Sequence, residues 1–502
     1  NRPYAKLTIT KKGERAARSG HPWVYGEEVT HVEGTYQTGD IVDVYSDKDR
    51  YLGTGFANDI SKIRVRIVSR NANDRFDEAF WQRRVKYALD YRRTVMGEKD
   101  FACCRLIFGD ADDMPGLTVD RYNDVLVAQA LCYGMDQVKP VIFKALVDEL
   151  AAMGVTIRGI YERNDVKVRK LDGMEEYKGW YEADFLPQPG SVLTTIDENG
   201  ILYDVDVENG QKTGFFLDQK YNRLAVAKIA AGKHVLDCFT HTGAFALNAA
   251  KGGAASVTAV DISQEAVDMT NENIRRNGLE AIVTAKQANV FDLLTDLAEH
   301  KCHDYDFIIL DPPAFTKSGH TVRNAMRGYK EINLKAMKLL PRGGYLATCS
   351  CSHFMRDDLF RQMLHDAAKD AGVRLRQIEG RQQSPDHPIL WNVPETNYLK
   401  FYLFQVYSVK RRCLRVTAPF LFCEMRMFDP PGCHLVEQPE AIDAQRDESE
   451  EPPFDVAAEE LQTCSIKSET LAVDDRIAAD PAAEHDFAPR VGDSERTNRN
   501  DD

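Results

Sequence analysis

The chain has 502 residues, of which 43% are hydrophobic and 9% aromatic, a composition typical of a globular protein with several cores. No apolar run reaches the roughly 18 residues that cross a bilayer, so we expect no membrane-spanning segment and no membrane partner. The net charge of −14 argues against a uniformly basic nucleic-acid-binding protein, and the 11 cysteines lack the paired spacing of zinc sites. We therefore expect a cytoplasmic protein with reduced thiols, no metal site and no secretory signal.

The acidic charge is concentrated at the C-terminal end of the chain. Residues 411–502 contain 10 basic and 22 acidic residues, a net charge of −12. Residues 455–502 are also poor in aromatic residues, so we predict that 411–502 form a disordered acidic tail. Residues 1–98 instead carry 18 basic and 14 acidic residues, a net charge of +4. A local basic surface for nucleic acid therefore remains compatible with the overall charge.

Residues 1–75 are predicted to form a small β-rich domain. Short strands at 40–45 and 62–68 alternate in character, and glycines separate them. In the second strand, Lys62, Arg64 and Arg66 share one face and three apolar residues share the other, because successive side chains of a strand point to opposite sides. This cationic face is either solvated or in contact with RNA, and the sequence does not separate the two.

Residues 76–190 are predicted to form a small α+β domain. Apolar residues at helical spacing indicate helices at 76–98 and 136–152, and the strands expected are 101–108, 117–121, 125–132 and 156–162.

Residues 191–410 alternate between strands and helices, the pattern of a doubly wound parallel sheet. The predicted fold class is therefore α/β, with a Rossmann-like domain preceded by the two smaller domains. The strand at 307–311 is continuously apolar, as a strand buried on both faces should be. The other strands are predicted at 235–237, 257–261, 345–348 and 398–409, and the helices at 243–251, 263–277, 323–340 and 356–371.

The loop after the first strand of this domain suits a nucleotide-like cofactor. It runs from Asp237 through Phe239 and Thr240 to Gly243, where a ligand can approach the backbone and a helix N-terminus offers N–H groups. The loop lacks the Gly-x-Gly-x-x-Gly fingerprint, so no pyrophosphate is expected. Asp261, at the end of the next strand, can accept both ribose hydroxyls. A ribose without a pyrophosphate fits S-adenosylmethionine (SAM).

Two further positions accompany this loop. Ile262 follows Asp261 and is included among the cofactor residues, and Asn289 lies near the end of the third strand, where it can hydrogen-bond adenine. In the alternative interpretation Asp261 is only a helix N-cap and Asn289 is an ordinary loop residue.

The strand that ends at Asp311 is followed by Pro312 and Pro313. Two prolines fix the backbone and remove two N–H donors, so the loop can form a rigid rim whose carbonyls face a planar base. Phe315 is then available for stacking and Lys317 for a phosphate, and Asp311 can orient the base or relay a proton. The alternative is a purely structural turn.

Cys349 and Cys351 follow the next strand, and a thiol at a strand end in a cleft is a candidate nucleophile. A buried structural cysteine is the commoner alternative. Carbon 5 of a pyrimidine is a poor nucleophile, but addition of a thiolate to carbon 6 makes it enamine-like, so that it can attack a sulfonium methyl. Methylation of an exocyclic amine needs no thiol. The cysteine pair therefore separates the two reaction types.

Segments along most of the chain together resemble bacterial large-subunit (23S) ribosomal RNA cytosine-5 methyltransferases with an N-terminal PUA domain. The match runs from about residue 4 to about 409. The segments that carry it are 20–24, 39–42, 105–110, 115–122, 212–219, the loop at 238–239, 311–313 and 350–352.

The resemblance implies a PUA domain, a small α+β domain and a Rossmann-like methyltransferase domain. It implies that Phe216, Asp218 and Gln219 help to close the cofactor pocket. It places the nucleophile at Cys351, in a Ser-Cys-Ser segment, whereas related enzymes have Thr-Cys-Ser, which here is the register of Cys349. We favour Cys351. The family usually has Asp where this chain has Asn289, and residues 411–502 have no recognised counterpart.

The sequence thus predicts a SAM-dependent enzyme that forms 5-methylcytosine in 23S ribosomal RNA or a large-subunit precursor. The main alternative is methylation of a guanine nitrogen in ribosomal RNA, which needs no thiol. A non-catalytic PUA-type RNA-binding protein is a further alternative, and an NAD-dependent oxidoreductase is least favoured because the pyrophosphate fingerprint is missing. The oligomeric state is open, with a homodimer as one option.

Overall fold

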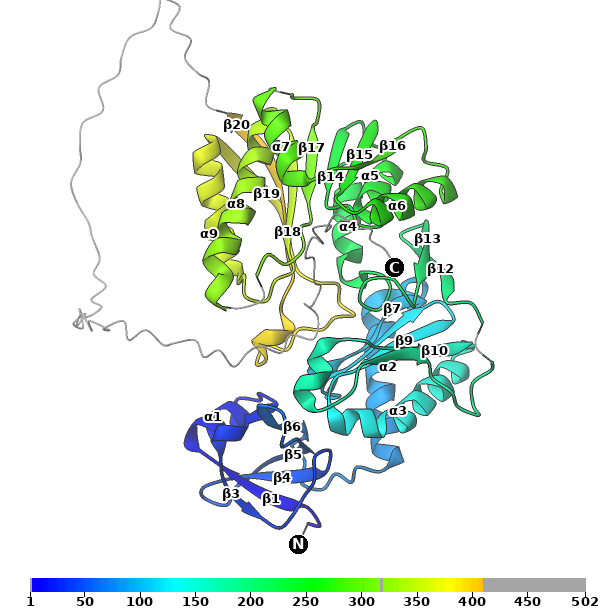
Figure 1. The fold of residues 1–502 in the computed structure, drawn as a ribbon, viewed down its shortest axis with the longest axis vertical. Coiled ribbons are helices and arrows are strands. Elements are labelled where there is room, and N and C mark those ends of the chain that lie inside the picture. Colours follow the sequence, from blue (N-terminus) through cyan, green and yellow to red (C-terminus); the bar gives the residue numbers. More distant parts are fainter. Residues whose placement is uncertain (1, 189, 301, 317–318, 410–502) are drawn as a thin grey trace, which may run out of the picture. The chain divides into compact units, whose positions relative to one another are not determined.

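The computed structural model describes residues 2–188, 190–300, 302–316 and 319–409 (Figure 1). The acidic tail predicted at 411–502 and the phosphate contact predicted for Lys317 lie outside the described residues. No helix in these ranges is long and apolar enough to cross a membrane. Within the same ranges, no group of three or more His, Cys, Asp or Glu side chains is placed to hold a metal ion.

The N-terminal sheet has six strands in the order β2-β6-β5-β4-β1-β3, and of the five strand pairs in this described sheet only β1–β4 is parallel. Helix α1 (Lys11–Arg18) follows the first strand, and Thr10 caps it by accepting a hydrogen bond from Gly13 N. In β6 the apolar residues are buried and Arg64 and Arg66 are half-buried, as the alternating pattern predicts. The strands are β1 (Ala5–Ile9), β2 (Trp23–Tyr25), β3 (Val29–Glu33), β4 (Ile41–Ser46), β5 (Tyr51–Ala57) and β6 (Ile63–Ser69).

The second sheet has five strands in the order β11-β10-β9-β8-β7. Asp77 caps α2 (Glu78–Asp100) by accepting from Phe80 N, and the helix is interrupted at Gly97, whose φ is 74°. Helix α3 (Tyr133–Ala152) packs against α2 in the same apolar core. The strands are β7 (Cys103–Phe108), β8 (Leu117–Tyr122), β9 (Val125–Ala130), β10 (Gly159–Asn164) and β11 (Tyr177–Trp180).

A two-stranded hairpin, β12 (Leu193–Glu198) and β13 (Ile201–Asp206), leads to a seven-stranded sheet of order β16-β15-β14-β17-β18-β20-β19. The first five strands in this order are mutually parallel, and β20 is antiparallel to both of its neighbours. This is the arrangement of a doubly wound α/β sheet with antiparallel pairing at one end. The strands are β14 (His234–Cys238), β15 (Ser256–Asp261), β16 (Val283–Gln287), β17 (Phe307–Leu310), β18 (Tyr345–Ser350), β19 (Val373–Arg381) and β20 (Lys400–Val409).

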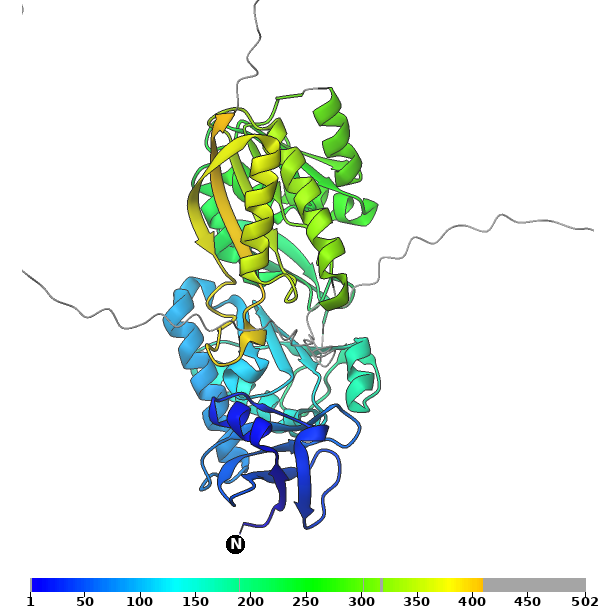
Figure 2. The same ribbon diagram turned by 90° about the vertical axis from the view of Figure 1, so that its left-hand side faces the viewer.

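Helices cover both faces of this sheet, and alternate strand residues point into two different cores. Val235 and Ile309 pack on the side of α4 and α5, whereas Leu236 and Leu310 pack on the side of α8 and α9. Figure 2 shows α8 and α9, yellow-green and yellow, lying along one face of the sheet. The helices are α4 (Lys220–Ala227), α5 (Ala244–Lys251), α6 (Gln264–Arg276), α7 (Val290–Glu299), α8 (Val322–Leu339) and α9 (Asp357–Ala371).

The predicted order of strands and helices is confirmed, and the Rossmann-like fold class with it, but several elements were missed. The third strand of the large sheet ends at Gln287, and Asn289 begins α7 instead of ending a strand. Strand β19 was not predicted, because its sequence is mostly polar and most of its residues are exposed or half-buried.

Candidate active site

The polar residues predicted for the cofactor and the chemistry converge at the carboxyl ends of β14, β17 and β18. Leu310 pairs with Thr348 in the sheet register, so Asp311 and Cys349 stand next to each other beyond that pair. Side chains alternate along a strand, so Asp237, Asp311 and Cys349 all point to the face that carries α4 and α5. The structure therefore brings these three side chains to one side of the sheet.

Asp237 is fully buried at the end of β14. Its Oδ2 accepts hydrogen bonds from Thr240 Oγ1 at 2.5 Å and from Ala246 N at 3.0 Å, and its buried Oδ1 accepts none within the described part of the chain. Burial raises the pKa of Asp237 to about 7, and the nearby Asp311 carboxylate adds to the rise. A buried carboxylate oxygen without a donor fits a cationic ligand such as SAM.

The loop between β14 and α5 has left-handed backbone at Phe239, His241 and Gly243, with φ of 63°, 52° and 80°. Asp261 stabilises this loop, because its Oδ2 accepts from His241 N at 2.9 Å and its Oδ1 accepts from Ser263 N at 3.0 Å. The N-cap of α6 is Ser263, so Asp261 is not simply a helix cap. Each oxygen keeps a second acceptor position for a ribose hydroxyl.

Gly243 has a packing role in addition to the one predicted. A Cβ at this position would lie 2.7 Å from Thr270 Cγ2 and 2.8 Å from Leu247 Cδ1, so the space beside it is filled by α5 and α6. Helix α6 thus packs against Gly243 and fixes the loop between β14 and α5, and the close approach of a ligand to the Gly243 backbone stays a prediction.

Ile262 and Asn289 lie next to this loop. Ile262 is 57% exposed directly after Asp261, so an apolar surface is available for a planar adenine. Asn289 is the exposed N-cap of α7, and its Oδ1 accepts a hydrogen bond from Phe291 N at 2.9 Å. The capping bond leaves the amide N–H groups of Asn289 as the donors for a base.

Asp311 contacts both Gln219, in the segment Phe216–Gln219, and Cys349. Gln219 Nε2 donates to Asp311 Oδ1 at 3.1 Å, and the Cys349 thiol is hydrogen-bonded to the same carboxylate. Burial raises the pKa of Asp311 to about 7, with a further contribution from the charge of Asp218. Burial also raises the pKa of Cys349 well above its usual value, and its side chain is fully buried in the core.

Cys351 differs from Cys349 in its surroundings. It lies one residue beyond the end of β18 and is half-buried. Burial raises the pKa of its thiol to about 11, while the positive charges of Lys212 and Lys400 act in the opposite direction. The segment that follows is held in place, because Ser352 Oγ donates to Thr316 O at 3.0 Å and Lys400 Nζ donates to Ser352 O at 2.6 Å.

The Pro-Pro loop connects these groups to an aromatic cluster. Pro312 is buried and Pro313 is exposed, so one proline anchors the loop and the other forms its rim. The half-buried Phe315 ring lies 4.6 Å from the Tyr329 ring and 5.8 Å from the Phe291 ring, measured between centroids. Phe315 therefore packs against Tyr329 and Phe291 with part of its ring exposed, and its stacking on a base stays a prediction.

The segment Phe216–Gln219 packs against the cofactor loop, as the resemblance implies. The Phe216 and His241 rings are 5.1 Å apart, and Arg223 donates to Phe216 O at 2.7 Å. Asp218 is buried, accepts from Tyr398 Oη at 2.7 Å, and has an Oδ1 without a hydrogen-bond partner among the described residues. Burial alone would raise the pKa of Asp218, but the charges of His387 and Lys212 outweigh it and lower the pKa.

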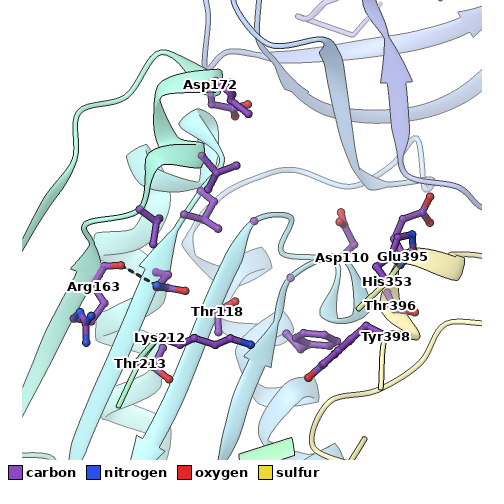
Figure 3. Close-up of a pocket in the computed structure, with 18 of the residues that line it drawn as sticks. Asp110, Thr118, Arg163, Asp172, Lys212, Thr213, His353, Glu395, Thr396 and Tyr398 are labelled. Carbon is purple, nitrogen blue, oxygen red and sulfur yellow. Dashed lines mark hydrogen bonds between the residues drawn. The ribbon is translucent and has the colours of Figure 1, made fainter. Parts of the chain in front are cut away.

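A cavity of about 650 Å³ adjoins this segment and is lined by Lys212, Phe216, Asp218 and His353 among others. In Figure 3 the Lys212 side chain extends toward Tyr398, while His353 and Glu395 lie together on the facing side. His353 follows Cys351 by two residues, so the cavity leads to the thiol end of the sheet. Basic residues from β6 and β10, Arg66 and Arg163, also line it.

Sequence reasoning missed Lys212, His353 and Tyr398 as residues of this region. Lys212 lies in a segment that was singled out, but nothing in its immediate sequence marks its left-handed φ of 54°, which turns its side chain toward the cavity. Tyr398 lies nearly fifty residues after Cys351, and only the fold brings the two segments to the same cavity. His353 could have been identified by its spacing from Cys351.

Two family models match the chain: a PUA-like domain over residues 7–70 and an S-adenosylmethionine-dependent methyltransferase over residues 162–405. Among similar proteins, ribosomal RNA large subunit methyltransferase I of Aeromonas salmonicida is 39% identical over 395 residues, which cover 78% of this chain and 97% of that protein. The protein of the same name from Shewanella amazonensis is 40% identical over 396 residues, 79% and 98% of the two chains.

The chain belongs to the ribosomal RNA large subunit methyltransferase I family. This member of the family is accordingly a SAM-dependent methyltransferase, and the N-terminal sheet is its PUA-like domain. Among solved structures, a putative SAM-dependent methyltransferase from Streptococcus mutans has a TM-score of 0.66 at 23% identity and covers 80% of this chain and 100% of its own. A putative methyltransferase complexed with SAH has a TM-score of 0.67 at 24% identity, with the same coverage. These two structures share the fold of the family member described here.

Proposed function

We propose that this member of the ribosomal RNA large subunit methyltransferase I family methylates carbon 5 of a cytosine in 23S ribosomal RNA or its precursor, in the cytoplasm. The names of its relatives support an RNA target in the large ribosomal subunit. The observation that carries the cytosine-5 assignment is the half-buried Cys351 thiol at the end of β18, on the same edge of the sheet as the SAM loop. Methylation of a guanine nitrogen gives no role to such a thiol.

We assign the cofactor pocket to the loop Asp237–Gly243 with Asp261, Ile262 and Asn289, and its closing segment to Phe216–Gln219. Asp261 has acceptor positions for the ribose hydroxyls, and Ile262 presents an apolar surface for adenine. The orphaned Oδ1 of Asp237 supports the placement of a cationic group beside it. Bound SAM supplies an electrophilic methyl group on its positively charged sulfur.

In the proposed reaction, the Cys351 thiol gives its proton to solvent and the thiolate adds to carbon 6 of the cytosine, forming a C–S bond and moving the carbon 5–carbon 6 π electrons onto carbon 5. This electron pair then attacks the methyl carbon of SAM, so that a C–C bond forms while the methyl–sulfur bond breaks and its electrons stay on the neutral thioether product. A base next removes the carbon-5 proton, and the C–S bond breaks to restore the aromatic ring and release the thiolate. Asp311 has a pKa of about 7, which suits a group that holds or relays this proton at neutral pH.

The surroundings of the two thiols support Cys351 over Cys349 as the nucleophile. Cys349 is enclosed in the core and its thiol is hydrogen-bonded to Asp311, so it can position that carboxylate but is closed to a base. Cys351 is partly open, and the charges of Lys212 and Lys400 favour its thiolate. Pro313 offers the exposed rim of the adjacent loop as a support for the cytosine.

We also propose three domains in chain order: an RNA-binding domain over 1–75, a central domain over 76–190, and the methyltransferase domain over 191–410. A homodimer remains one option for the assembly, and the molar mass in solution, measured by light scattering, decides it.

The test is mass analysis of nucleosides from ribosomal RNA of a strain that lacks this protein, before and after the wild type or a variant is added back. The wild type should restore 5-methylcytidine, Cys351→Ser should abolish it, and Cys349→Ser should keep at least a tenth of it. Full methylation by Cys351→Ser would refute the nucleophile assignment. A change in a methylguanosine, with 5-methylcytidine unaffected, would refute the proposed function.

A further inference from the structure

Trp391 is the most exposed large hydrophobic side chain among the described residues, at 99% of its surface. Of the other tryptophans, Trp23 and Trp81 are buried and Trp180 is half-buried. Placing a whole indole ring in water forgoes the burial of some 200 Å² that normally stabilises a tryptophan. Neither the cofactor pocket nor the core gives this ring a role.

The loop that carries Trp391 is firmly anchored on both sides of it. Before Trp391, Asp386 Oδ2 accepts from Arg105 N at 2.8 Å, and Arg92 donates to Asp386 O at 2.9 Å. After it, Val393 is buried, and Thr396 Oγ1 accepts from Leu390 N at 2.9 Å across the base of the turn. The ring is therefore presented by a rigid loop, and its exposure does not come from a lack of packing around it.

Exposed cations are carried by the segment that contacts the residue after Trp391. The side chain of Asn392, the residue after Trp391, occupies the space beside Gly20, where a Cβ would collide with its amide. Gly20 directly follows α1, whose last turn carries the exposed Arg15 and Arg18. Arg70, also exposed, donates to His21 O at 3.0 Å.

A second contact fixes this neighbourhood. His21 Nε2 lies 3.4 Å from Glu395 Oε2, so the turn after α1 contacts the Trp391 loop at both Asn392 and Glu395. Exposed Lys11 and Lys12 begin the same helix, and Glu14 is its only acidic residue. The surface thus combines one open aromatic ring with several arginines and lysines, and we call Trp391, Arg15, Arg18 and Arg70 the Trp391 platform.

We propose that the Trp391 platform binds a single-stranded segment of the RNA substrate outside the catalytic pocket, with one nucleobase stacked on the indole and the neighbouring phosphates on the arginines. An aromatic ring interleaved with cations is the combination that holds single strands without reading their sequence. The cavity of about 650 Å³ is lined by Val393 and Glu395 of the same loop and by His353, two residues after Cys351, so the loop of the platform and the segment after Cys351 border one cavity. This inference rests on the proposed function, because it takes RNA as the substrate.

The first experiment measures binding of a fluorescein-labelled single-stranded RNA of about 12 nucleotides by anisotropy, with the full-length protein. Trp391→Leu should weaken binding about tenfold, and Trp391→Phe, which keeps an aromatic face, should restore most of the affinity. Addition of unlabelled RNA should quench the tryptophan fluorescence of the wild type, and Trp391→Phe should lose that quenching.

The charged half of the platform has its own test and control. Arg15→Ala combined with Arg18→Ala should lower the slope of log Kd against log salt by about 1.4, because two phosphate contacts to a single strand are lost. Lys369→Ala removes an exposed cation from α9, on the methyltransferase sheet, and should leave the slope unchanged. Equal Kd values for the wild type and Trp391→Leu would overturn the platform.

Different results would refute the Trp391 platform and the proposed function. If the platform is right, Trp391→Leu raises KM for ribosomal RNA about tenfold and leaves kcat for 5-methylcytidine within twofold. If wild-type protein forms no 5-methylcytidine yet binds the RNA through Trp391, the proposed function fails and the platform stands. If Trp391→Leu weakens binding to assembled ribosomal subunits but not to naked RNA, the ring contacts a protein and the proposal is wrong.

Discussion

Asp237 is a buried and Asp311 a half-buried carboxyl group at the ends of adjacent strands, and the charge of Asp311 adds to the rise in the pKa of Asp237. Both have pKa values of about 7 in the protein without cofactor, so they titrate as a pair near neutrality. Neither carboxylate is fully compensated, because Asp237 has an orphaned oxygen and Asp311 is bonded to a neutral amide and a thiol. The site is therefore electrostatically prepared for a cation.

The first prediction follows from this pair. Below pH 7 the two carboxyl groups are largely protonated and neutral, and above pH 7 they are ionised, so the positively charged SAM should bind more tightly as pH rises. Between pH 6 and pH 8 the affinity should increase roughly tenfold, as expected when one group with a pKa near 7 must be ionised. Isothermal titration calorimetry at the two pH values measures it.

Asp237→Asn is the matched variant for this measurement, since the amide is isosteric and does not titrate. It should bind SAM weakly at both pH values, with a flatter dependence. An affinity that is the same at pH 6 and pH 8 in the wild type would show that neither carboxyl group senses the cofactor charge.

At the scale of elements, the loop between β19 and β20 connects the methyltransferase sheet to α2 and β7. Its central residue Asp386 is fully buried and contacts His387 Nδ1 at 2.9 Å in addition to Arg105 N. Burial alone would raise the pKa of Asp386, but the charge and hydrogen bond of His387 lower it to about 2. The ionised carboxylate is thus the form that holds the loop.

We predict that Asp386→Ala lowers the free energy of unfolding by about 3 kcal/mol at pH 7, because it leaves buried donors without their acceptor. A carboxyl group whose folded pKa is depressed stabilises the fold above its unfolded value of 3.8, and this contribution is lost as pH falls toward 2. Urea denaturation of wild type and variant should therefore show a difference that narrows between pH 4 and pH 2. Asp386→Asn, which keeps the shape and one acceptor oxygen, should lose less, and an equal loss in both variants would assign the whole effect to the negative charge.

Strands and helices of the large α/β domain could be predicted from the sequence where the spacing of apolar residues or a helix-capping residue marks them clearly. The apolar run at 307–310 and the helix after Ser263 are examples, because continuous burial and an N-cap leave clear local signals. Strand β19 could not be found this way, since its hydrogen bonds to β20 and not its own side chains make it a strand.

The candidate site was predictable only in part for the same reason. The residues at strand ends, such as Asp237 and Asp311, follow from sequence position alone, because parallel strands end at one edge. The packing role of Gly243 against Thr270, and the burial of Phe315 beside Tyr329, depend on contacts between segments distant in sequence. Nor does any local pattern predict that Cys349 is closed and Cys351 half-open.

At the scale of the whole molecule, the net charge of −14 is not spread evenly along the chain. Residues 411–502 account for −12 of it, whereas exposed cations gather on α1 of the PUA-like domain. Long-range repulsion between an acidic segment and RNA depends on ionic strength, and it falls off within about 10 Å at 0.1 M salt. The negative charge of residues 411–502 should therefore weaken RNA binding only at low salt concentration.

We predict that a chain ending at Lys410 binds single-stranded RNA several-fold more tightly than the full chain at about 50 mM salt and equally at about 500 mM. Anisotropy titrations at the two concentrations provide the measurement. A full chain in which acidic residues of 455–502 are replaced by Asn and Gln is the matched control, and it should behave like the shortened chain. A difference in RNA affinity that persists at the higher salt concentration would indicate a specific contact made by the removed residues and not long-range repulsion.

Strand β20, the last described element of the chain, lies inside the seven-stranded sheet, between β18 and β19. It pairs along the whole of β18, with Phe401 opposite Cys349 and Lys400 opposite Ser350. During synthesis on the ribosome, the edge of β18 that faces away from β17 therefore remains unpaired until residues 400–409 have left the exit tunnel. A nascent chain holds its thiols on an unfinished sheet until then, so we expect the enzyme to become competent only after β20 has emerged from the ribosome.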